Sequence, residues 1–177
     1  MSDDALIKQA QSGDAQAFEE LLGIYYDTLF RFAFKWCGNR EDAEDVTQQA
    51  CIKLARSIDQ FRFDAAFTSW LYRLVINCAK DWSKSQQRHR HQEDIEEHTE
   101  IETADSSESK VFAWQVLQKL DALPDGIKET ILLVHAEGLS HKEAADALGV
   151  KESTISWRLH EVRKSLNLLF NHEAIYD

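Results

Sequence analysis

The chain has 177 residues, a net charge of −11 and a pI near 5.1, a length that fits one domain or two small ones. One proline and six glycines disfavour a turn-rich all-β fold, and three cysteines without a C-x-x-C pair argue against a disulfide scaffold or a zinc site. No apolar run approaches the ~18 residues of a membrane helix, and the N-terminus lacks a basic, apolar leader. We therefore expect a mostly helical, cytoplasmic protein with no membrane insertion of its own, no cofactor and no metal.

The N-terminal part predicts two amphipathic helices. Large apolar residues recur at helical spacing over residues 18–36, and Gly38 followed by Asn39 predicts a helix end and a new N-cap. Residues 43–58 then carry an apolar stripe, and Asp42 lies in the first turn of this helix. The side opposite the stripe is acidic and polar, with Glu41, Glu44, Asp45, Gln48 and Gln49. This acidic face is either a solvated surface or a docking site for a basic partner. Because the paired Glu-x-x-His motifs of di-iron bundles are missing, we expect neither metal binding nor catalysis.

A loop-like stretch precedes the next helix and consists of Phe61, Arg62, Phe63, Asp64 and Ala65. Two aromatic residues flank an arginine in it. Either both phenylalanines fill the core, or the loop forms a pocket for an extruded base.

The most informative segment is a helix expected over residues 67–88. One side is apolar, and a second stripe, spaced 3, 4, 3, 4 and 4 residues, consists of Trp70, Arg73, Asn77, Lys80, Lys84 and Arg88. Cations neutralise phosphates, an amide can read a base edge, and an aromatic ring can stack on an unpaired base. Residues 62–90 carry six basic and two acidic groups, a net charge of +4. In an acidic protein this concentration favours a nucleic-acid surface over a merely solvated basic face.

An acidic segment follows over residues 91–108, with eight acidic groups, no basic group and only two large apolar residues. Such a segment cannot bury enough surface to offset its ordering entropy, so it is predicted to be a flexible linker. It divides the chain into residues 10–90 and 109–170.

The C-terminal part predicts a helix-turn-helix. A helix is expected over residues 111–120, and Ser140 with Glu143 forms a capping box at the start of a short helix. A turn at Gly149 leads to a last helix that opens at Ser153 or Thr154. Its outward side carries Thr154, Ser156, Trp157, Arg158, His160, Arg163 and Lys164. The alternative is a plain three-helix packing unit.

Taken together, these blocks resemble the bacterial sigma factors of the extracytoplasmic-function (group IV) class in the sigma-70 family. The resemblance covers about residues 10–170. It is carried by residues 42–48 with 53–54, 61–62 leading to 67–73, Asn77 with Asp81, 123–124, and 138–166.

The resemblance implies an all-α chain of two small helical domains. Residues 10–90 would be sigma region 2, residues 109–170 would be sigma region 4, and residues 91–108 would be the acidic linker. The chain would be a non-enzymatic alternative sigma factor that binds core RNA polymerase and directs promoter-specific initiation. The acidic face would dock on the β′ clamp helices, and the β flap and an anti-sigma factor would be further partners.

The same resemblance assigns the contacts to promoter DNA. The loop at residues 61–65 would hold a flipped base of the minus-ten element, and the stripe from Trp70 to Arg88 would bind and help open that element. The last helix would enter the major groove of the minus-35 element.

A one-component helix-turn-helix regulator with an N-terminal helical sensor domain is the alternative. The basic stripe together with the acidic face favours the sigma factor, because a ligand sensor requires neither.

Overall fold

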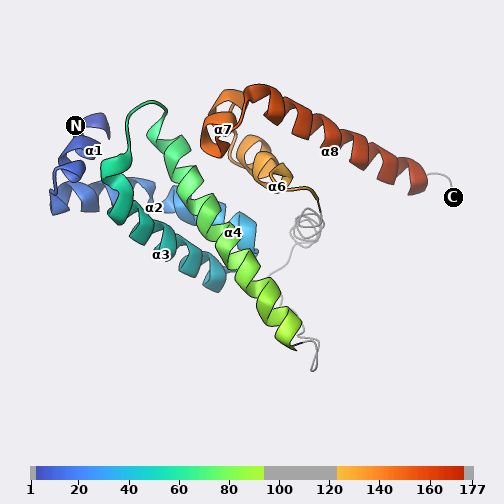
Figure 1. Ribbon diagram of the computed structural model, residues 1–177, viewed down its shortest axis with the longest axis horizontal. Coiled ribbons are helices and arrows are strands. Elements are labelled where there is room, and N and C mark those ends of the chain that lie inside the picture. Colours follow the sequence, from blue (N-terminus) through green and yellow to red (C-terminus); the bar gives the residue numbers. More distant parts are fainter. Residues whose placement is uncertain (1–2, 94–122, 174–177) are drawn as a thin grey trace. The chain divides into compact units, whose positions relative to one another are not determined.

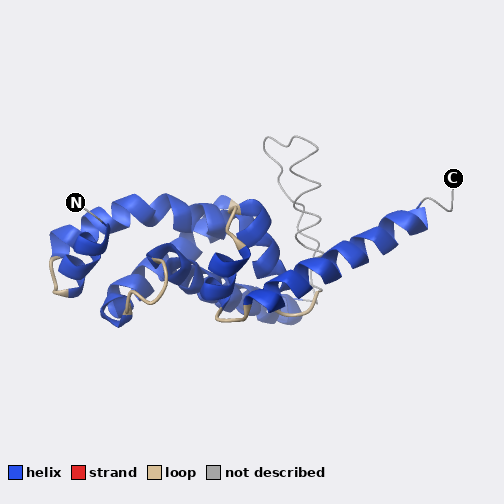
Figure 2. Ribbon diagram, turned by 90° about the horizontal axis from the view of Figure 1, so that it is seen from above, coloured by secondary structure: helices blue, strands red, loops and turns tan. Residues whose placement is uncertain are grey.

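The computed structural model describes residues 3–93 and 123–173 of the chain (Figure 1). All regular structure in these residues is helical, as Figure 2 shows, so the predicted all-α fold is confirmed for them. The chain divides into two compact units, Met1–Trp114 and Gln115–Asp177, which are described separately. The helix expected over residues 111–120 and the linker from residue 94 onward lie outside the described residues.

The N-terminal unit contains α1 (Asp3–Gln11), α2 (Ala15–Cys37), α3 (Arg40–Ser57), the short η1 (Ile58–Gln60) and α4 (Phe67–Glu93). The predicted boundary between α2 and α3 is confirmed. Gly38 ends α2 with a left-handed φ of 80°, and the Asn39 side chain accepts from the Asp42 N–H to cap α3. Helix α4 extends beyond the expected residue 88, since neither glycine nor proline interrupts residues 67–93.

The core of this unit lies where α2, α3 and α4 pack together. Its fully buried side chains include one aromatic ring, Phe32, whose centroid lies 5.7 Å from that of Tyr72 in an edge-on arrangement. Around it lie Leu21, Leu29, Leu54, Leu71 and Val75. Each such side chain contributes about 1.5–3 kcal/mol through burial. The helices are therefore held by their apolar sides, and their polar sides face outward.

Helix α1 was not expected from the sequence, which placed the start of the first domain at residue 10. It packs on α2 through Leu6, Ile7 and Ala10, all of them buried. The Tyr25 hydroxyl donates to Asp3 Oδ2 at 2.6 Å, and burial, together with this hydrogen bond, raises the pKa of Tyr25. These contacts make α1 an integral part of the N-terminal unit.

The C-terminal unit contains α6 (Ile127–Ile131), the π-helical turn η2 (Leu132–Ala136), α7 (His141–Leu148) and α8 (Glu152–Glu173). The helices α7 and α8, with the turn at Gly149, form the predicted helix-turn-helix. Their crossing is close because α7 presents small buried residues, Ala144, Ala145 and Ala147, toward Ile155 and Leu159 of α8, which are also buried. Helix α8 begins at Glu152, slightly earlier than expected, since the Lys151 carbonyl already accepts from the next turn.

The predicted capping box is present at the start of α7. Ser140 Oγ accepts from the Glu143 N–H at 3.2 Å, and Glu143 Oε2 accepts from the Ser140 N–H at 2.8 Å. Ser140 Oγ also donates to Glu143 Oε2 at 2.7 Å. These bonds fix where the first helix of the helix-turn-helix begins.

Acidification should weaken α7 through Glu143. The Ser140 side chain and N–H lower the pKa of this carboxyl below its ordinary value of 4.5. A carboxyl with a depressed folded pKa stabilises the fold above its unfolded pKa, and this contribution is lost as the pH falls from 4.5 through the folded pKa. Amide-exchange protection of α7 should drop over this window in the wild-type chain and should lack this component in Glu143→Gln, whose amide does not titrate. Parallel profiles for the two proteins would contradict the expectation.

Candidate nucleic-acid interface

The loop at residues 61–65 connects η1 to α4, and the structure separates its two phenylalanines. Phe61 is 7% exposed, and its ring centroid lies 5.1 Å from that of Phe67 and 5.5 Å from that of Trp70. Phe63 is 37% exposed, and its ring is tilted by 57° against that of Phe61, with 4.8 Å between the two centroids. Of the two alternatives, core filling therefore holds for Phe61, whereas Phe63 offers its ring to solvent.

Phe63 has a φ of 60°, in the left-handed region. For a residue with a side chain this conformation costs about 1–2 kcal/mol, so its surroundings must hold it in place. The flanking Arg62 and Asp64 are exposed and Ala65 is half-buried. An exposed ring on a strained but supported backbone is a suitable platform for a flat, unpaired base.

The predicted stripe runs along one continuous helix, α4. Its exposed members are Arg73, Asn77, Lys84 and Arg88, and its half-buried members are Trp70 and Lys80. One carboxylate near the stripe, Asp81, pairs with Lys53 of α3 at 3.2 Å. The stripe therefore keeps its positive character, and it starts directly beside the aromatic cluster that supports the loop.

The predicted acidic face lies on α3, but its members differ in what they do. Asp42 is half-buried and ties α3 to α4, because its Oδ1 accepts from Trp82 Nε1 at 3.1 Å. Its Oδ2 accepts from Asn39 Nδ2 at 2.6 Å. No local pattern indicates this structural role, since 40 residues separate Asp42 from Trp82.

The other acidic-face residues are exposed and available. Glu44 pairs with Arg40 at 2.7 Å, an exposed i,i+4 pair of the kind worth about 0.3–0.5 kcal/mol, which a partner can easily displace. Within the described residues, Asp45 and Gln48 make no side-chain hydrogen bond or ion pair. Asp45 can therefore bind a basic surface without first breaking a hydrogen bond or an ion pair.

On α8, the exposed side chains are Ser156, Trp157, His160, Arg163 and Lys164, while Thr154 is half-buried. Trp157 is 57% exposed, an unusual state for a tryptophan. Ser156 Oγ lies 3.1 Å from His141 Nδ1, which links α8 to the first residue of α7.

Arg158 is half-buried, like Thr154, and part of its side chain packs against the same unit. Its guanidinium lies over Gly126, where an added Cβ would meet Arg158 Cζ at 2.3 Å, and Nη1 lies 3.4 Å from Thr130 Oγ1. Arg158 lies three residues after the buried Ile155 and directly before the buried Leu159, which places it at the edge of the inward side of α8. Only Gly126, with no side chain, leaves room for the guanidinium there.

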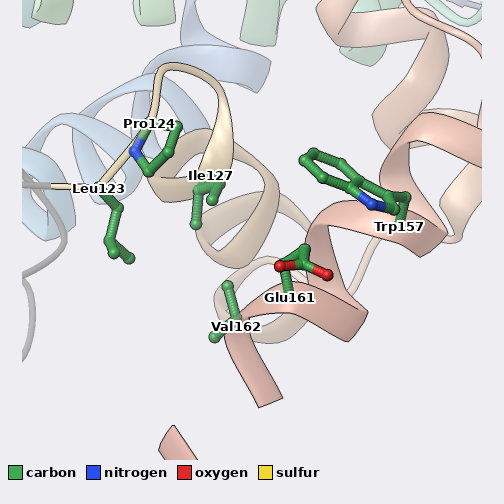
Figure 3. Close-up of a pocket in the computed structure, with 6 residues that line it drawn as sticks. All are labelled: Leu123, Pro124, Ile127, Trp157, Glu161 and Val162. Atoms are coloured by element: carbon green, nitrogen blue, oxygen red, sulfur yellow. The ribbon is translucent and has the colours of Figure 1, made fainter. Parts of the chain in front are cut away.

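A small hollow of about 110 Å³ lies in the C-terminal unit (Figure 3). Its walls are largely apolar and come from Leu123, Pro124 and Ile127 on one side and Trp157, Glu161 and Val162 on the other. Ligand pockets usually span about 300–1,000 Å³, so this hollow fits a single side chain rather than a cofactor.

The remaining chemistry of the described residues is limited. None of their His, Cys, Asp and Glu side chains forms a group of three or more suited to a metal ion. Burial raises the pKa of the Cys51 and Cys78 thiols, which keeps both protonated and poorly nucleophilic. Over residues 3–93 and 123–173, no helix combines the length and hydropathy that a bilayer span requires.

Comparison with known proteins gives matches to both units. Residues 21–89 match the family model for sigma-70 region 2, and residues 113–166 match that for sigma-70 region 4. The ECF RNA polymerase sigma-E factor of Haemophilus influenzae is 30% identical over 178 residues, 94% of each chain. The ECF RNA polymerase sigma factor SigW of Bacillus subtilis is 28% identical over 90% of this chain and 92% of its own.

Solved structures show the same architecture. CnrH, in complex with the cytosolic domain of CnrY, superposes with a TM-score of 0.70 at 25% identity, covering 96% of this chain and 97% of CnrH. The sigma factor RpoE of Bartonella quintana, in complex with the anti-sigma factor NepR, has a TM-score of 0.66 at 22% identity. It covers 89% of this chain and 98% of its own.

Replacing Arg158 should destabilise the C-terminal unit. We expect Arg158→Ala to lower its free energy of unfolding by about 1 kcal/mol, because the guanidinium packs over Gly126. Arg163→Ala is the matched control, since Arg163 is exposed on the same helix. Amide exchange of α6 and α7 in the full chain measures the difference, and equal protection in both variants would refute the inward role of Arg158.

Proposed function

Because this chain belongs to the extracytoplasmic-function class of the sigma-70 family, we propose that its two units divide promoter recognition between them. The protein is an alternative sigma factor that directs transcription initiation, and the family has no catalytic activity of its own. Residues 10–90 would bind core RNA polymerase and the minus-ten element. Residues 109–170 would bind the minus-35 element, and residues 91–108 would connect the two.

The observation that carries this proposal is the continuity of the loop with the α4 stripe. The exposed Phe63 ring packs at a tilt against Phe61, which packs on Trp70, and Trp70 is the first member of the stripe. Extruding a base costs a few kcal/mol, and stacking on an aromatic ring returns about 1–3 kcal/mol per base. The loop would capture the base, with Asn77 and the cations of α4 holding the strand beside it.

The acidic face would supply the polymerase contact. Glu44, Asp45 and Gln48 are exposed on one helix, and the partner surface we propose is the basic side of the β′ clamp helices. Asp42 would act mainly by fixing the start of α3 against α4 through Trp82.

The helix-turn-helix would place α8 in the major groove at minus-35. The proposed contacts are the exposed residues and the half-buried Thr154 at its start: Thr154, Ser156, Trp157, His160, Arg163 and Lys164. Arg158, half-buried like Thr154, stays in this proposed set, and its guanidinium also packs against Gly126. Because the two DNA-binding units are linked, the avidity that they gain by binding together depends on the spacing of the minus-ten and minus-35 elements.

Further partners and the site of action follow from the same class. The β flap of the polymerase would contact the C-terminal unit, and the protein would act in the cytoplasm, where promoter DNA lies. We also propose an anti-sigma factor, as CnrH has a bound CnrY domain, to cover the acidic and basic faces. The alternative of an N-terminal sensor domain finds no support, because residues 21–89 match sigma-70 region 2.

Two measurements test the polymerase contact: the affinity for core polymerase, and run-off transcription from a promoter library with core polymerase. The wild-type chain should yield specific transcripts, and Glu44→Lys with Asp45→Lys should weaken polymerase binding at least about tenfold, because like charges would then face each other. The control is Glu19→Lys with Glu20→Lys, an equal charge change on exposed residues of α2. Undiminished polymerase binding by the α3 variant would refute the docking role.

Promoter opening tests the stripe. Asn77→Ala with Lys84→Ala should reduce permanganate reactivity of the minus-ten thymines more than it reduces closed-complex formation, because these exposed side chains would hold the single strand. Trp70 is left intact because it also packs on Phe61. His89→Ala, exposed on the same helix but about 140° around its axis from Lys84, is the control. Wild-type reactivity in the double variant would argue against the assignment.

A further inference from the structure

Gln11, the last residue of α1, is hydrogen-bonded to the chain just before the loop at residues 61–65. Its Nε2 donates to the carbonyl oxygens of Ile58 and Phe61, both at 2.9 Å. The two acceptors are 47 and 50 residues away in sequence, so these bonds join separate parts of the unit. The side-chain amide of Gln11 therefore uses both of its N–H donors on main-chain carbonyls that lie before the loop and at its first residue.

A second contact from α1 reaches the other phenylalanine of the loop. Lys8 lies one helical turn before Gln11, and its Nζ lies 5.3 Å from the centre of the Phe63 ring. Helix α1 is itself fixed, because Leu6 and Ile7 are buried and Asp3 accepts from Tyr25. It is therefore a firm support for the loop.

The loop requires such support. Phe63 holds a left-handed φ of 60°, which a phenylalanine adopts only when neighbouring contacts impose it. The Gln11 bond to the Phe61 carbonyl fixes the main chain two residues before that position. Without this bond, we expect the loop to relax and the Phe63 ring to leave its place on Phe61.

We propose that Gln11 is a positioning residue for base capture. It acts through the main chain of Ile58 and Phe61 to hold the Phe63 ring where an unpaired base can stack on it, and it does not itself touch DNA. This inference rests on the proposed role of the loop in capturing a minus-ten base. Neither Gln11 nor Lys8 lies within residues 21–89, the part that matches sigma-70 region 2.

The test replaces the donor while keeping the shape of the side chain. Gln11→Glu puts a carboxylate oxygen in place of Nε2, opposite the two carbonyl oxygens. Gln9→Glu is the matched control, because Gln9 is exposed on the same helix and takes the same charge change. Gln11→Met, which keeps length without donor or charge, serves if the glutamate variant fails to fold.

The probe is a single-stranded oligonucleotide with the nontemplate minus-ten sequence of a promoter recovered by run-off transcription. It is bound by the full chain in complex with core polymerase. A series of oligonucleotides carries one abasic position each. In wild type, one position should cost about tenfold in affinity when its base is removed. In the Gln11 variants, affinity for the intact strand should fall about tenfold and this abasic penalty should nearly vanish.

The possible outcomes distinguish the positioning role of Gln11 from base capture by the loop. A lost penalty, with polymerase affinity unchanged and Gln9→Glu behaving as wild type, supports the positioning role. A retained penalty in both Gln11 variants overturns it, even where affinity falls uniformly, because that pattern marks a general structural or charge effect. If the wild-type complex shows no abasic penalty at any position, base capture by the loop itself is overturned.

Discussion

The burial of one apolar side of α2, α3 and α4 against the others is the interaction on which the N-terminal unit depends. Phe32, Leu54 and Leu71, one from each helix, are almost completely buried in this core. Once those sides are buried, the acidic face of α3 and the basic stripe of α4 must face outward. The binding surfaces are thus a direct consequence of how the core forms.

The acidic residues of α3 and the basic residues of α4 lie on neighbouring helices and attract one another. Two specific contacts limit how far they pair. Lys53 pairs with Asp81, and Trp82 binds Asp42, so the charges nearest the α3–α4 contact are already satisfied. Most of the remaining predicted groups are exposed, the acidic ones on α3 and the basic ones on α4. A small acidic protein can therefore present one surface to a protein partner and another to DNA, with salt weakening both contacts.

The two binding regions use rigidity differently. In the N-terminal unit a strained loop is held by tilted and edge-on aromatic contacts and by Gln11, which suits the capture of a single base. In the C-terminal unit, small alanines and a capping box set the angle of two helices, which suits insertion of a whole helix into a groove. Arg158 contributes to that rigidity through the packing of its guanidinium over Gly126.

The sequence by itself determined the helices, their caps and their faces, because these depend on neighbours within a few residues. The spacing of apolar residues marked the core sides, and Gly38, Asn39, Ser140 and Glu143 marked the ends. Only the tertiary structure decided which phenylalanine of the loop is buried, which way Arg158 turns and that α1 supports the loop. Helical periodicity assigns a residue to a face but does not say what lies opposite. Contacts such as Gln11 with Phe61, formed across 50 residues, leave no local signal in the chain.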